Sequence, residues 1–303
     1  MRYQNTAIAT HKYNYESNRR NFTIAPDTSK VHELKTKDQK ETLAFLAIRP
    51  VHTVVMTSFI NDNGIEGSLN RGKFYGYRNS LGTLEGIALI GHTTLVEARS
   101  EEALKALAFT AKSAETPIHL IMSSGTAAES FWDYYSDGIV QPRLRCTEIL
   151  FEINFPFLVQ ECKQEIRPAD ADELLQVAEA QAEIAFMECG IDPMRKDREG
   201  FLKRVARRIE QGRIFVVFEN GKLVFKADII SETVDVIYLE GIYVGAEFRG
   251  QGIGYKCLSK LCLELLNRVQ NICLLSNVDF KKAHQSFRKA GFKNTNQCTT
   301  IFV

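Results

Sequence analysis

Three glycines and an arginine lie close together in the second half of the chain, in a pattern that could bind a phosphate group. Arg249, Gly250, Gly252 and Gly254 follow a run typical of a strand over 236–244 and open a run typical of a helix. Glycines let the backbone turn tightly and approach a ligand closely. The N-terminus of a helix adds unpaired N–H groups and a partial positive charge, and arginine adds a fixed positive charge. The spacing predicts a cradle for a pyrophosphate group.

A turn that binds nothing is the alternative for any isolated glycine-rich segment. The helix expected over 252–269 has no acidic residue before Glu264, so no carboxylate near its start would repel a phosphate.

The elements that position this cradle follow from hydrophobic periodicity and turn residues. Asp170 is a credible N-cap, and Asn220-Gly221 between two apolar runs indicates a hairpin. The second half predicts, in order, a strand, two helices, three antiparallel strands, a helix, a strand, a helix and a strand, over 164–167, 171–189, 199–211, 213–218, 223–229, 236–244, 252–269, 271–275, 281–289 and 299–303.

The first half repeats this order in outline. A short helix over 41–48 is expected to end before Pro50, because proline disfavours the helical conformation in the residue before it. Strands, helices and closing strands follow, with strands at 74–79, 84–91, 93–98, 118–122 and 143–153 and helices at 100–111 and 127–135. Mixed α/β architecture is therefore the expected fold class.

Length and composition predict two globular domains. A chain of 303 residues with 45% hydrophobic and 25% charged residues can bury two cores. The segment between Asn154 and Gln164 lacks the glycine and serine of a flexible linker, so the two halves are expected to pack together. We expect domains at 1–158 and 159–303.

Charge and cysteine usage exclude several classes of function. The net charge of +1 gives no global field that would attract nucleic acid or an anionic membrane. The chain contains no apolar run of 18 residues and no apolar core near its first residues, so neither a membrane span nor a signal peptide is expected. Its 7 cysteines are odd in number and form no CxxC pair, which favours a reducing, cytoplasmic setting without a metal site.

Two motifs together resemble the GNAT (GCN5-related N-acetyltransferase) superfamily. Arg249-x-x-Gly252-x-Gly254, after a strand ending at Val244, is similar to its pyrophosphate signature. Asn277, followed by the segment 283–292 (AHQSFRKAGF), is similar to the second signature, an Asn before Ala-x-x-x-Tyr-x-x-x-Gly-Phe. With the element order, the resemblance covers 164–303. The whole chain resembles a two-lobed bacterial group with a degenerate first lobe, which implies two tandem lobes, each with a mixed, mostly antiparallel sheet flanked by helices.

The resemblance implies acetyl-CoA as cofactor. Its pyrophosphate would lie on the backbone N–H groups of Gln251 to Tyr255, with pantetheine beside the strand end and near Asn277. The implied cofactor-binding residues are Ile242, Tyr243, Val244, Arg249, Gly250, Gln251, Gly252, Ile253, Gly254, Tyr255, Asn277, Phe280 and Phe287. The implied partner is a small-molecule or peptide amine, and the chain is expected to be a monomer or a homodimer.

Acetyl transfer to an amine needs a base and an acid. Glu240 and Tyr238 are on one face of the strand before the cradle, where family bases usually occur. Glu240 is the preferred base, because partial burial makes a carboxylate bind protons more tightly; a solvated strand carboxylate is the alternative. Asp228 and Asp235 are weaker candidates. His284, a lone histidine on a helix, more often packs or faces solvent.

Phe287 departs from the family pattern, which has a tyrosine that protonates the CoA thiolate. Phenylalanine has no such proton, so Tyr255, water or the substrate would supply it, or the thiolate would leave unassisted.

The corresponding segment of the first half lacks the cradle. Val96-Glu97-Ala98-Arg99-Ser100-Glu101-Glu102 has no glycine and three carboxylates. Like charge would repel a pyrophosphate there, so this lobe is not expected to bind acetyl-CoA.

Three functions remain open at this point. The first is an acetyl-CoA-dependent N-acetyltransferase that works by direct attack, and the second is a non-catalytic acyl-CoA-binding or sensor protein. A nucleotide-binding protein would need an acidic residue on the next parallel strand, and Ser276 and Asn277 end that strand instead. The acceptor stays open among small amines, amino acids, antibiotics, peptides and protein lysines, because the predicted acceptor region 184–208 has mixed charge.

Overall fold

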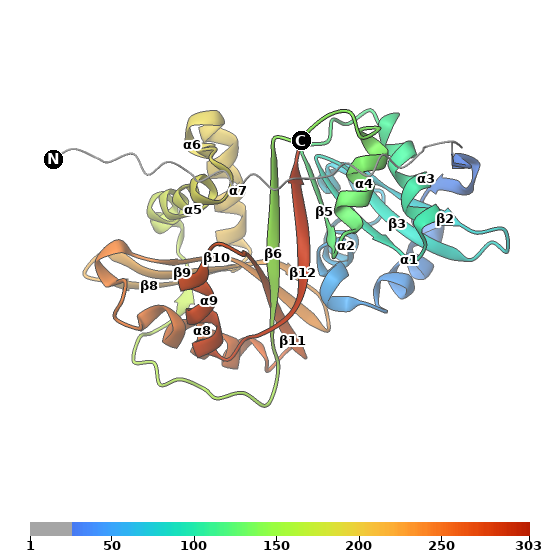
Figure 1. Cartoon of the computed structure of the whole chain (residues 1–303). Coiled ribbons are helices and arrows are strands. Elements are labelled where there is room, and N and C mark those ends of the chain that lie inside the picture. Colours follow the sequence, from blue (N-terminus) through green and yellow to red (C-terminus); the bar gives the residue numbers. More distant parts are fainter. Residues whose placement is uncertain (1–25) are drawn as a thin grey trace.

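The computed structural model describes residues 26–303 and joins their strands into one sheet (Figure 1). The strand order across that sheet is β1-β2-β3-β4-β5-β12-β6-β11-β10-β9-β8-β7. The first half contributes β1 (Val31–Glu33), β2 (Gly72–Arg78), β3 (Leu84–Gly91), β4 (Thr93–Ala98), β5 (Leu120–Ser124) and β6 (Leu144–Ile153). The second half contributes β7 (Arg167–Pro168), β8 (Ile214–Glu219), β9 (Lys222–Glu232), β10 (Val236–Val244), β11 (Asn271–Asn277) and β12 (Lys293–Phe302).

Helices cover both faces of the sheet. The first half has α1 (Gln39–Leu46), α2 (Pro50–Asn63), α3 (Glu101–Lys112) and α4 (Ala127–Tyr135). The second half has α5 (Leu174–Cys189), α6 (Pro193–Lys196), α7 (Arg198–Glu210), α8 (Ile253–Leu265) and α9 (Lys281–Ala290). We call β1–β6 with α1–α4 the N-lobe, and β7–β12 with α5–α9 the C-lobe.

Each lobe has a β-strand–helix–β-strand unit at its centre. In the N-lobe, β4 and β5 pair in parallel and α3 connects them; in the C-lobe, β10 and β11 pair in parallel and α8 connects them. The remaining strand pairs are antiparallel. The mixed, mostly antiparallel sheet expected from the sequence is confirmed.

The last strands of the two lobes are exchanged. The N-lobe strand β6 pairs with β11 of the C-lobe, and the C-lobe strand β12 pairs with β5 of the N-lobe. β6 and β12 also pair with each other along almost their whole length, and Figure 1 shows them side by side in the middle of the molecule. This exchange turns two sheets into one.

Separate hydrophobic cores lie under the helices. One core packs α3 and α4 on the N-lobe strands, a second packs α1 and α2 on the opposite side, and a third packs α8 and α9 on the C-lobe strands. A fourth core holds α5 and α7. α2 extends from the N-lobe over β9 and β10, where the Ser58 hydroxyl accepts a hydrogen bond from Glu232 N and Asp62 pairs with Arg213 at 3.0 Å.

Most expected elements are present, and local chemistry explains their ends. Ser100 caps α3 by accepting from Ala103 N, and Asp170 forms a capping box with Glu173 before α5. Asn220 and Gly221, with φ of 52° and 74°, turn the β8–β9 hairpin.

Three expectations need correction. The helix expected over 41–48 does end before Pro50, but Pro50 is itself the first residue of α2, a helix that was not expected, and its missing N–H costs nothing there. The strand expected at 164–167 is only Arg167–Pro168, because its partner β8 pairs with just these two residues. The strand expected at 299–303 begins six residues earlier, at Lys293, since it pairs along β6.

The segment from Asn154 to Ile166 contains no helix or strand. It lies between the expected domains 1–158 and 159–303, of which the first 25 residues lie outside the described part of the chain. Within residues 26–303, no helix combines the length and apolar composition that crossing a lipid bilayer requires.

Candidate active site

The glycine-rich turn after β10 leads directly into α8. Gly250 and Gly252 both have φ of 79°, a conformation that strains any residue with a Cβ. A Cβ on Gly254 would lie 2.7 Å from Val244 Cγ2, so glycine there lets the helix start pack against β10. The helical bonding of α8 begins with Lys256 N donating to Gly252 O at 3.4 Å. The N–H groups before it are those that a helix start leaves for a ligand.

Arg249 is engaged within the protein. Its Nε donates to Val244 O at 2.9 Å, and its guanidinium pairs with Glu183 of α5 at 2.9 Å. Tyr243 Oη donates to the same carboxylate at 3.0 Å. The hydrogen bond to Glu183 raises the pKa of Arg249. An anion at the cradle would therefore compete with Glu183 for Arg249.

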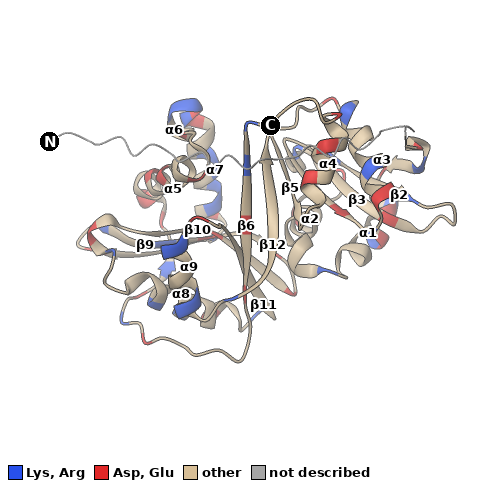
Figure 2. Ribbon diagram, viewed as in Figure 1, with Lys and Arg blue, Asp and Glu red and all other residues tan. Residues whose placement is uncertain are grey.

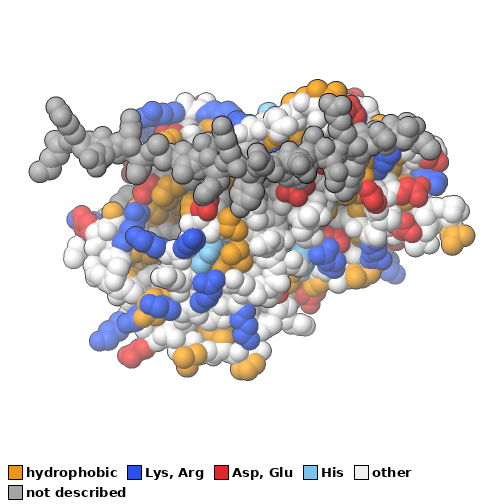
Figure 3. Space-filling view, viewed as in Figure 1, with side chains coloured by type: hydrophobic (Ala, Val, Ile, Leu, Met, Phe, Trp, Pro, Cys, Tyr) orange, Lys and Arg blue, Asp and Glu red, His pale blue; other side chains and the backbone are white. Residues whose placement is uncertain are grey.

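Further positive charge lies beside the cradle. The Tyr255 ring covers Gly252, and Lys289 of α9 lies with its Nζ 5.5 Å from the centre of that ring. α9 has no acidic residue and ends with Arg288 and Lys289. The ribbons of α8 and α9 include Lys and Arg positions (Figure 2), and several basic side chains lie on the face shown in Figure 3.

A β-bulge interrupts β10 immediately before the cradle. Glu240 pairs with Asp228 of β9, but the next pair is Tyr243 with Lys226, so β10 has one extra residue. Gly241 has φ of 61° at this bulge. Bulges redirect side chains and release backbone groups from a ladder, and this one lies where β10 separates from β11.

A buried ion pair supports the bulge from below. Lys226 is fully buried, with its Nζ 2.6 Å from Asp228 Oδ1. The same Nζ donates to Gly241 O at 3.1 Å and to Gln181 Oε1 at 2.7 Å. Burial lowers the pKa of Lys226, and the charge of Asp228 opposes that shift. Asp228 therefore supports the structure of the bulge and is not placed as a free base.

Tyr238 and Glu240 are in contact, as their spacing on one face of β10 predicted. Tyr238 Oη donates to Glu240 Oε1 at 2.6 Å. Tyr238 is buried and Glu240 half-buried. Burial first, then the charge of Glu240, raises the pKa of Tyr238 well above its ordinary value. The phenol thus stays protonated at neutral pH and can orient the carboxylate.

The charge of Glu240 acts on two further carboxyl groups. Burial raises the pKa of Glu148, on β6, to about 7, with the charge of Glu240 adding to the shift and a hydrogen bond from Thr300 opposing it. The protein atoms packed around the Glu188 carboxyl, followed by the charges of Glu240 and Glu148, raise its pKa to about 8, although part of Glu188 remains exposed. Carboxyl groups with such values exchange protons near neutral pH.

The second motif, Asn277 together with the segment 283–292, lies at the end of β11. Asn277 of β11 is the register partner of Glu148 on β6, and its side chain accepts a hydrogen bond from Asp279 N at 2.9 Å. Phe280 caps α9 and is half-buried. His284 is buried with Nε2 2.9 Å from Asn277 O, so it is a packing residue. Phe287 is buried against Phe151 at 5.4 Å between ring centres, which places it in the core beneath the sheet.

An arginine fills the equivalent site of the N-lobe. β4 and β5 separate after Leu95 and Met122, as β10 and β11 do after Leu239 and Leu274. The Arg49 guanidinium occupies this split, with Nη1 2.9 Å from Glu97 Oε1 and Nη2 3.1 Å from Ser124 Oγ.

The sequence correctly predicts that Tyr238, Glu240 and the glycine-rich turn lie near one another at one end of β10. It missed Glu148, because only the strand exchange brings β6 beside Asn277. It also missed Lys226, although a lysine inside the apolar hairpin strand at 223–229 was an available signal. Glu188 lies in the predicted acceptor region 184–208, whose mixed charge does not single it out.

Comparisons with known proteins agree with this architecture. Residues 210–294 match the family model described as an acetyltransferase (GNAT) domain. A search of curated proteins finds no match.

Solved structures share the fold over most of the chain. An acetyltransferase of the GNAT family from Colwellia psychrerythraea has a TM-score of 0.58 and 14% identity, covering 90% of this chain and 99% of its own. A Drosophila protein has a TM-score of 0.67 and 11% identity, covering 90% and 98%. A tandem GNAT protein from the clavulanic acid biosynthesis pathway has a TM-score of 0.56 and 11% identity, covering 90% and 97%.

The family model covers the β9–β10 hairpin, the cradle, α8 and the second motif, while the solved structures extend the likeness to both lobes. Residues 210–294 of the C-lobe therefore match the GNAT acetyltransferase domain, and the chain as a whole shares the two-lobed fold of the solved structures.

Proposed function

We propose that the C-lobe transfers an acetyl group from acetyl-CoA to an amine by direct attack, with Glu240 as the general base. The observation that carries this proposal is the adjacency of three features at the split between β10 and β11. These are the glycine cradle at the start of α8, the bulge at Gly241, and the Tyr238–Glu240 hydrogen bond. Together they offer an anion site, released backbone groups and a base.

The cradle residues support the cofactor assignment. The N–H groups of Gln251 to Tyr255 would hold the pyrophosphate, and Arg249 and Lys289 would add positive charge. The pantetheine would follow Ile242–Val244 and approach Asn277. Acetyl-CoA would supply the activated acyl group as a thioester. Residues of this chain would bind it, position the amine and accept its proton.

The proposed chemistry moves two protons and one acyl group. Glu240 accepts the proton of the incoming ammonium group, directly or through a water. The freed amine forms a C–N bond to the thioester carbon as the C–S bond breaks, and CoA leaves as a thiolate. Phe287 cannot protonate that thiolate, so Tyr255, a water or the departing amine proton serves.

The carboxylates favour an acceptor that arrives as a cation. Glu148, Glu188 and Glu240 influence one another electrostatically and lie around the place where the amine must attack. A positively charged amine would relieve their mutual repulsion. This narrows the acceptor to amines protonated at neutral pH, without choosing between a small molecule and a peptide lysine.

A non-catalytic acyl-CoA sensor is the second candidate, favoured by the position of Phe287 in the core and by Arg49 in the split of the N-lobe. Such a protein would bind acetyl-CoA and show no turnover with any amine. Release of free thiol in the presence of an amine panel would exclude it.

Isothermal titration with acetyl-CoA tests the binding step. We expect one site per chain, because Arg49 and Glu97 occupy the N-lobe split. Gly252→Glu should abolish binding, since it adds a carboxylate where the pyrophosphate approaches the backbone. Gly82→Glu is the matched control: Gly82 has the same φ of 79° in an open turn of the N-lobe. Two equivalent sites, or unchanged affinity in folded Gly252→Glu, would contradict the proposal.

A further inference from the structure

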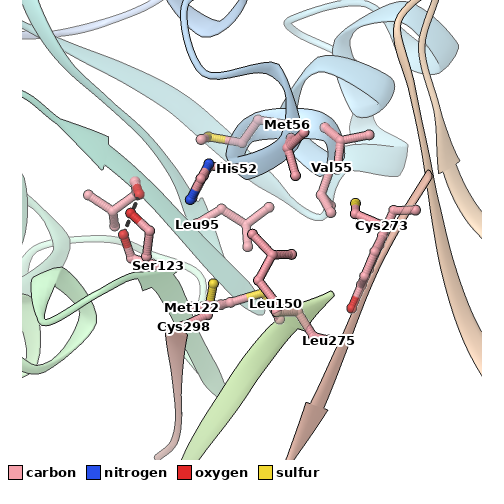
Figure 4. Close-up of a pocket in the computed structure, with 15 residues that line it drawn as sticks. His52, Val55, Met56, Leu95, Met122, Ser123, Leu150, Cys273, Leu275 and Cys298 are labelled. Carbon is pink, nitrogen blue, oxygen red and sulfur yellow. Dashed lines mark hydrogen bonds between the residues drawn. The ribbon is translucent and has the colours of Figure 1, made fainter. Parts of the chain in front are cut away.

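A partly open, largely apolar cavity lies where the two lobes meet. It has a volume of about 50 Å³ and is lined by α2, by β4 and β5 of the N-lobe, and by β6, β10, β11 and β12. Figure 4 shows Val55 and Met56 of α2 opposite Leu150, Cys273 and Leu275 on the sheet. Nothing in the acetyl-transfer reaction requires this space.

The cavity adjoins the candidate active site on the same face of the sheet. On three neighbouring strands, a cavity residue is followed two positions away by a site residue: Tyr238 by Glu240 on β10, Leu275 by Asn277 on β11, and Leu150 by Glu148 on β6. Side chains two positions apart point to the same face and stand about 6.6 Å apart. The cavity therefore borders the site residues along the sheet, with Leu275 level with Glu240 and paired with Leu150.

The split between β10 and β11 opens at the border of the cavity. The last paired residues are Leu239 and Leu274, one position before Glu240 and Leu275. A thioester held in that split would lie between Glu240 on β10 and the cavity residue Leu275 on β11. An acyl chain longer than acetyl would extend from the split toward the cavity.

The polar groups on the cavity wall are already satisfied. The Ser123 hydroxyl donates to Val96 O at 2.7 Å, and Tyr238 Oη donates to Glu240. His52 Nε2 lies 3.2 Å from Asn296 Nδ2, and burial followed by the charge of Arg49 lowers the pKa of His52 to about 4, so the ring is neutral at pH 7. Apolar cavities without unsatisfied polar groups stay dry and take up apolar ligands.

The volume limits the length of the occupant. A cavity of about 150 Å³ takes up one benzene ring, which corresponds to about 25 Å³ for each carbon atom. The 50 Å³ found here would accommodate about two carbons beyond the acetyl group.

We propose that this interlobe cavity binds the tail of a short acyl-CoA, and that the four-carbon butyryl group fits it best. The proposal rests on the proposed acyl-CoA-binding function of the C-lobe. The N-lobe binds no CoA itself, but on this proposal it forms part of the acyl site. Helix α2 and the split between β4 and β5 are the far wall of that site.

Titration of the full chain with CoA, acetyl-CoA, butyryl-CoA and hexanoyl-CoA tests the proposal. Each buried methylene contributes about a fourfold gain in affinity, so butyryl-CoA, with two more methylenes, should bind about 16-fold more tightly than acetyl-CoA. Hexanoyl-CoA should bind no more tightly than butyryl-CoA. Affinity that is equal for acetyl and butyryl, or that falls with chain length, would overturn the cavity assignment and leave the proposed function intact. Failure of all four ligands to bind would contradict the proposed function itself.

Two variants locate the effect. Val54→Phe fills the cavity from α2 and should remove the preference for butyryl-CoA while leaving acetyl-CoA affinity within about twofold. Met56→Ala enlarges the cavity and should shift the optimum toward hexanoyl-CoA, so the idea remains testable if the larger side chain at Val54 prevents folding. Thr57→Val, on the same helix but away from the cavity wall, is the control and should keep the wild-type order of affinities. An unchanged chain-length profile in folded Val54→Phe or Met56→Ala would reject the site.

Discussion

At the scale of single residues, the Tyr238–Glu240 hydrogen bond defines what the site can do. A phenol that remains protonated holds the carboxylate in one orientation, while two neighbouring carboxyl groups titrate near neutrality. If Glu240 is the base, Glu240→Gln should keep acyl-CoA affinity and lower the transfer rate by about 100- to 10,000-fold. The loss should shrink at high pH, where the amine is already neutral. The pH–rate profile measures this.

Glu240→Gln alone does not tell a base from a carboxylate that merely attracts the amine. Glu188→Gln and Glu148→Gln provide the comparison, because they remove a neighbouring charge and leave Glu240 in place. We expect them to raise the KM for the amine more than they lower kcat. If either slows kcat as severely as Glu240→Gln, that carboxylate is the better candidate for the base.

The raised pKa values of Glu148 and Glu188 also predict how stability depends on pH. Each folded pKa lies above its ordinary value of 4.5, at about 7 and about 8, so the folded chain holds protons that the unfolded chain loses. Their favourable contribution is complete below pH 4.5 and is lost as pH rises through the folded values. Glu188→Gln should therefore be more stable than wild type at pH 8 but not at pH 4. Each kcal/mol gained in the free energy of unfolding at pH 8 should raise Tm by about 2–4 °C.

Thermal unfolding at both pH values checks this, with Glu179→Gln, an exposed position of α5, as the control. A Glu188→Gln chain that melts at the wild-type temperature at pH 8 would show that the carboxyl is not held in its protonated form.

At this scale, sequence reasoning finds residues that a motif brings together. Glu240 and Tyr238 are two positions apart on one strand, and the cradle glycines lie within five residues of one another, so spacing alone predicts that each set lies together. Glu148 and Glu183 come from other elements, and their place near the site depends on the strand exchange and on the packing of α5. No local pattern encodes either contact.

At the scale of elements, the bulge in β10 depends on the Lys226–Asp228 pair. Lys226→Met would leave Asp228 as a buried charge whose nearest remaining cation is Arg208 at 3.7 Å. Removing one partner of a buried ion pair destabilises by about 3–5 kcal/mol. We expect a loss of that size in urea unfolding, together with weaker acyl transfer, because Gly241 loses its hydrogen bond.

The double variant Lys226→Met with Asp228→Leu separates the two roles. It should recover most of the stability, since replacing both partners of a buried pair with apolar groups is often neutral, without restoring the hydrogen bond to Gly241. A double variant with full transfer activity would show that Lys226 does not position the bulge.

Elements with a strong local signal were predicted correctly. The Asn220-Gly221 turn fixes the β8–β9 hairpin, and Ser100 and Asp170 mark the starts of α3 and α5. α2 was missed because Pro50 suggested an end rather than a beginning, and both are physically allowed for proline. The length of β12 could not be derived, since its first six residues, Lys293 to Cys298, are stabilised by pairing with β6 rather than by an apolar run.

At the scale of the whole molecule, the strand exchange makes each lobe incomplete alone. Residues 159–303 lack β6, which leaves β11 without one of its partners, and residues 1–158 lack β12. Exposed strand edges are prone to aggregation. We expect each fragment expressed alone to be insoluble or unfolded, and the two fragments expressed together to form a complex that binds acetyl-CoA.

A chain cut after folding provides the control. A protease site inserted near Leu158, which is exposed and lies in the segment without helix or strand, should allow cleavage with retention of binding. If residues 159–303 alone give a folded monomer with full acetyl-CoA affinity, the exchanged strand β6 is not needed to complete the sheet.

The exchange also bears on how the protein is made. β5 ends at Ser124 and finds its antiparallel partner only in β12, which begins at Lys293. At about 5–20 residues per second, a ribosome needs about 10–30 s to synthesise the intervening chain. Throughout that interval β5 remains an unpaired edge of the N-lobe sheet. β6 is also unpaired until β11 has been synthesised. We therefore expect the first half to complete its fold only when almost the last residue has emerged, and a product truncated before β12 to contain no stable domain.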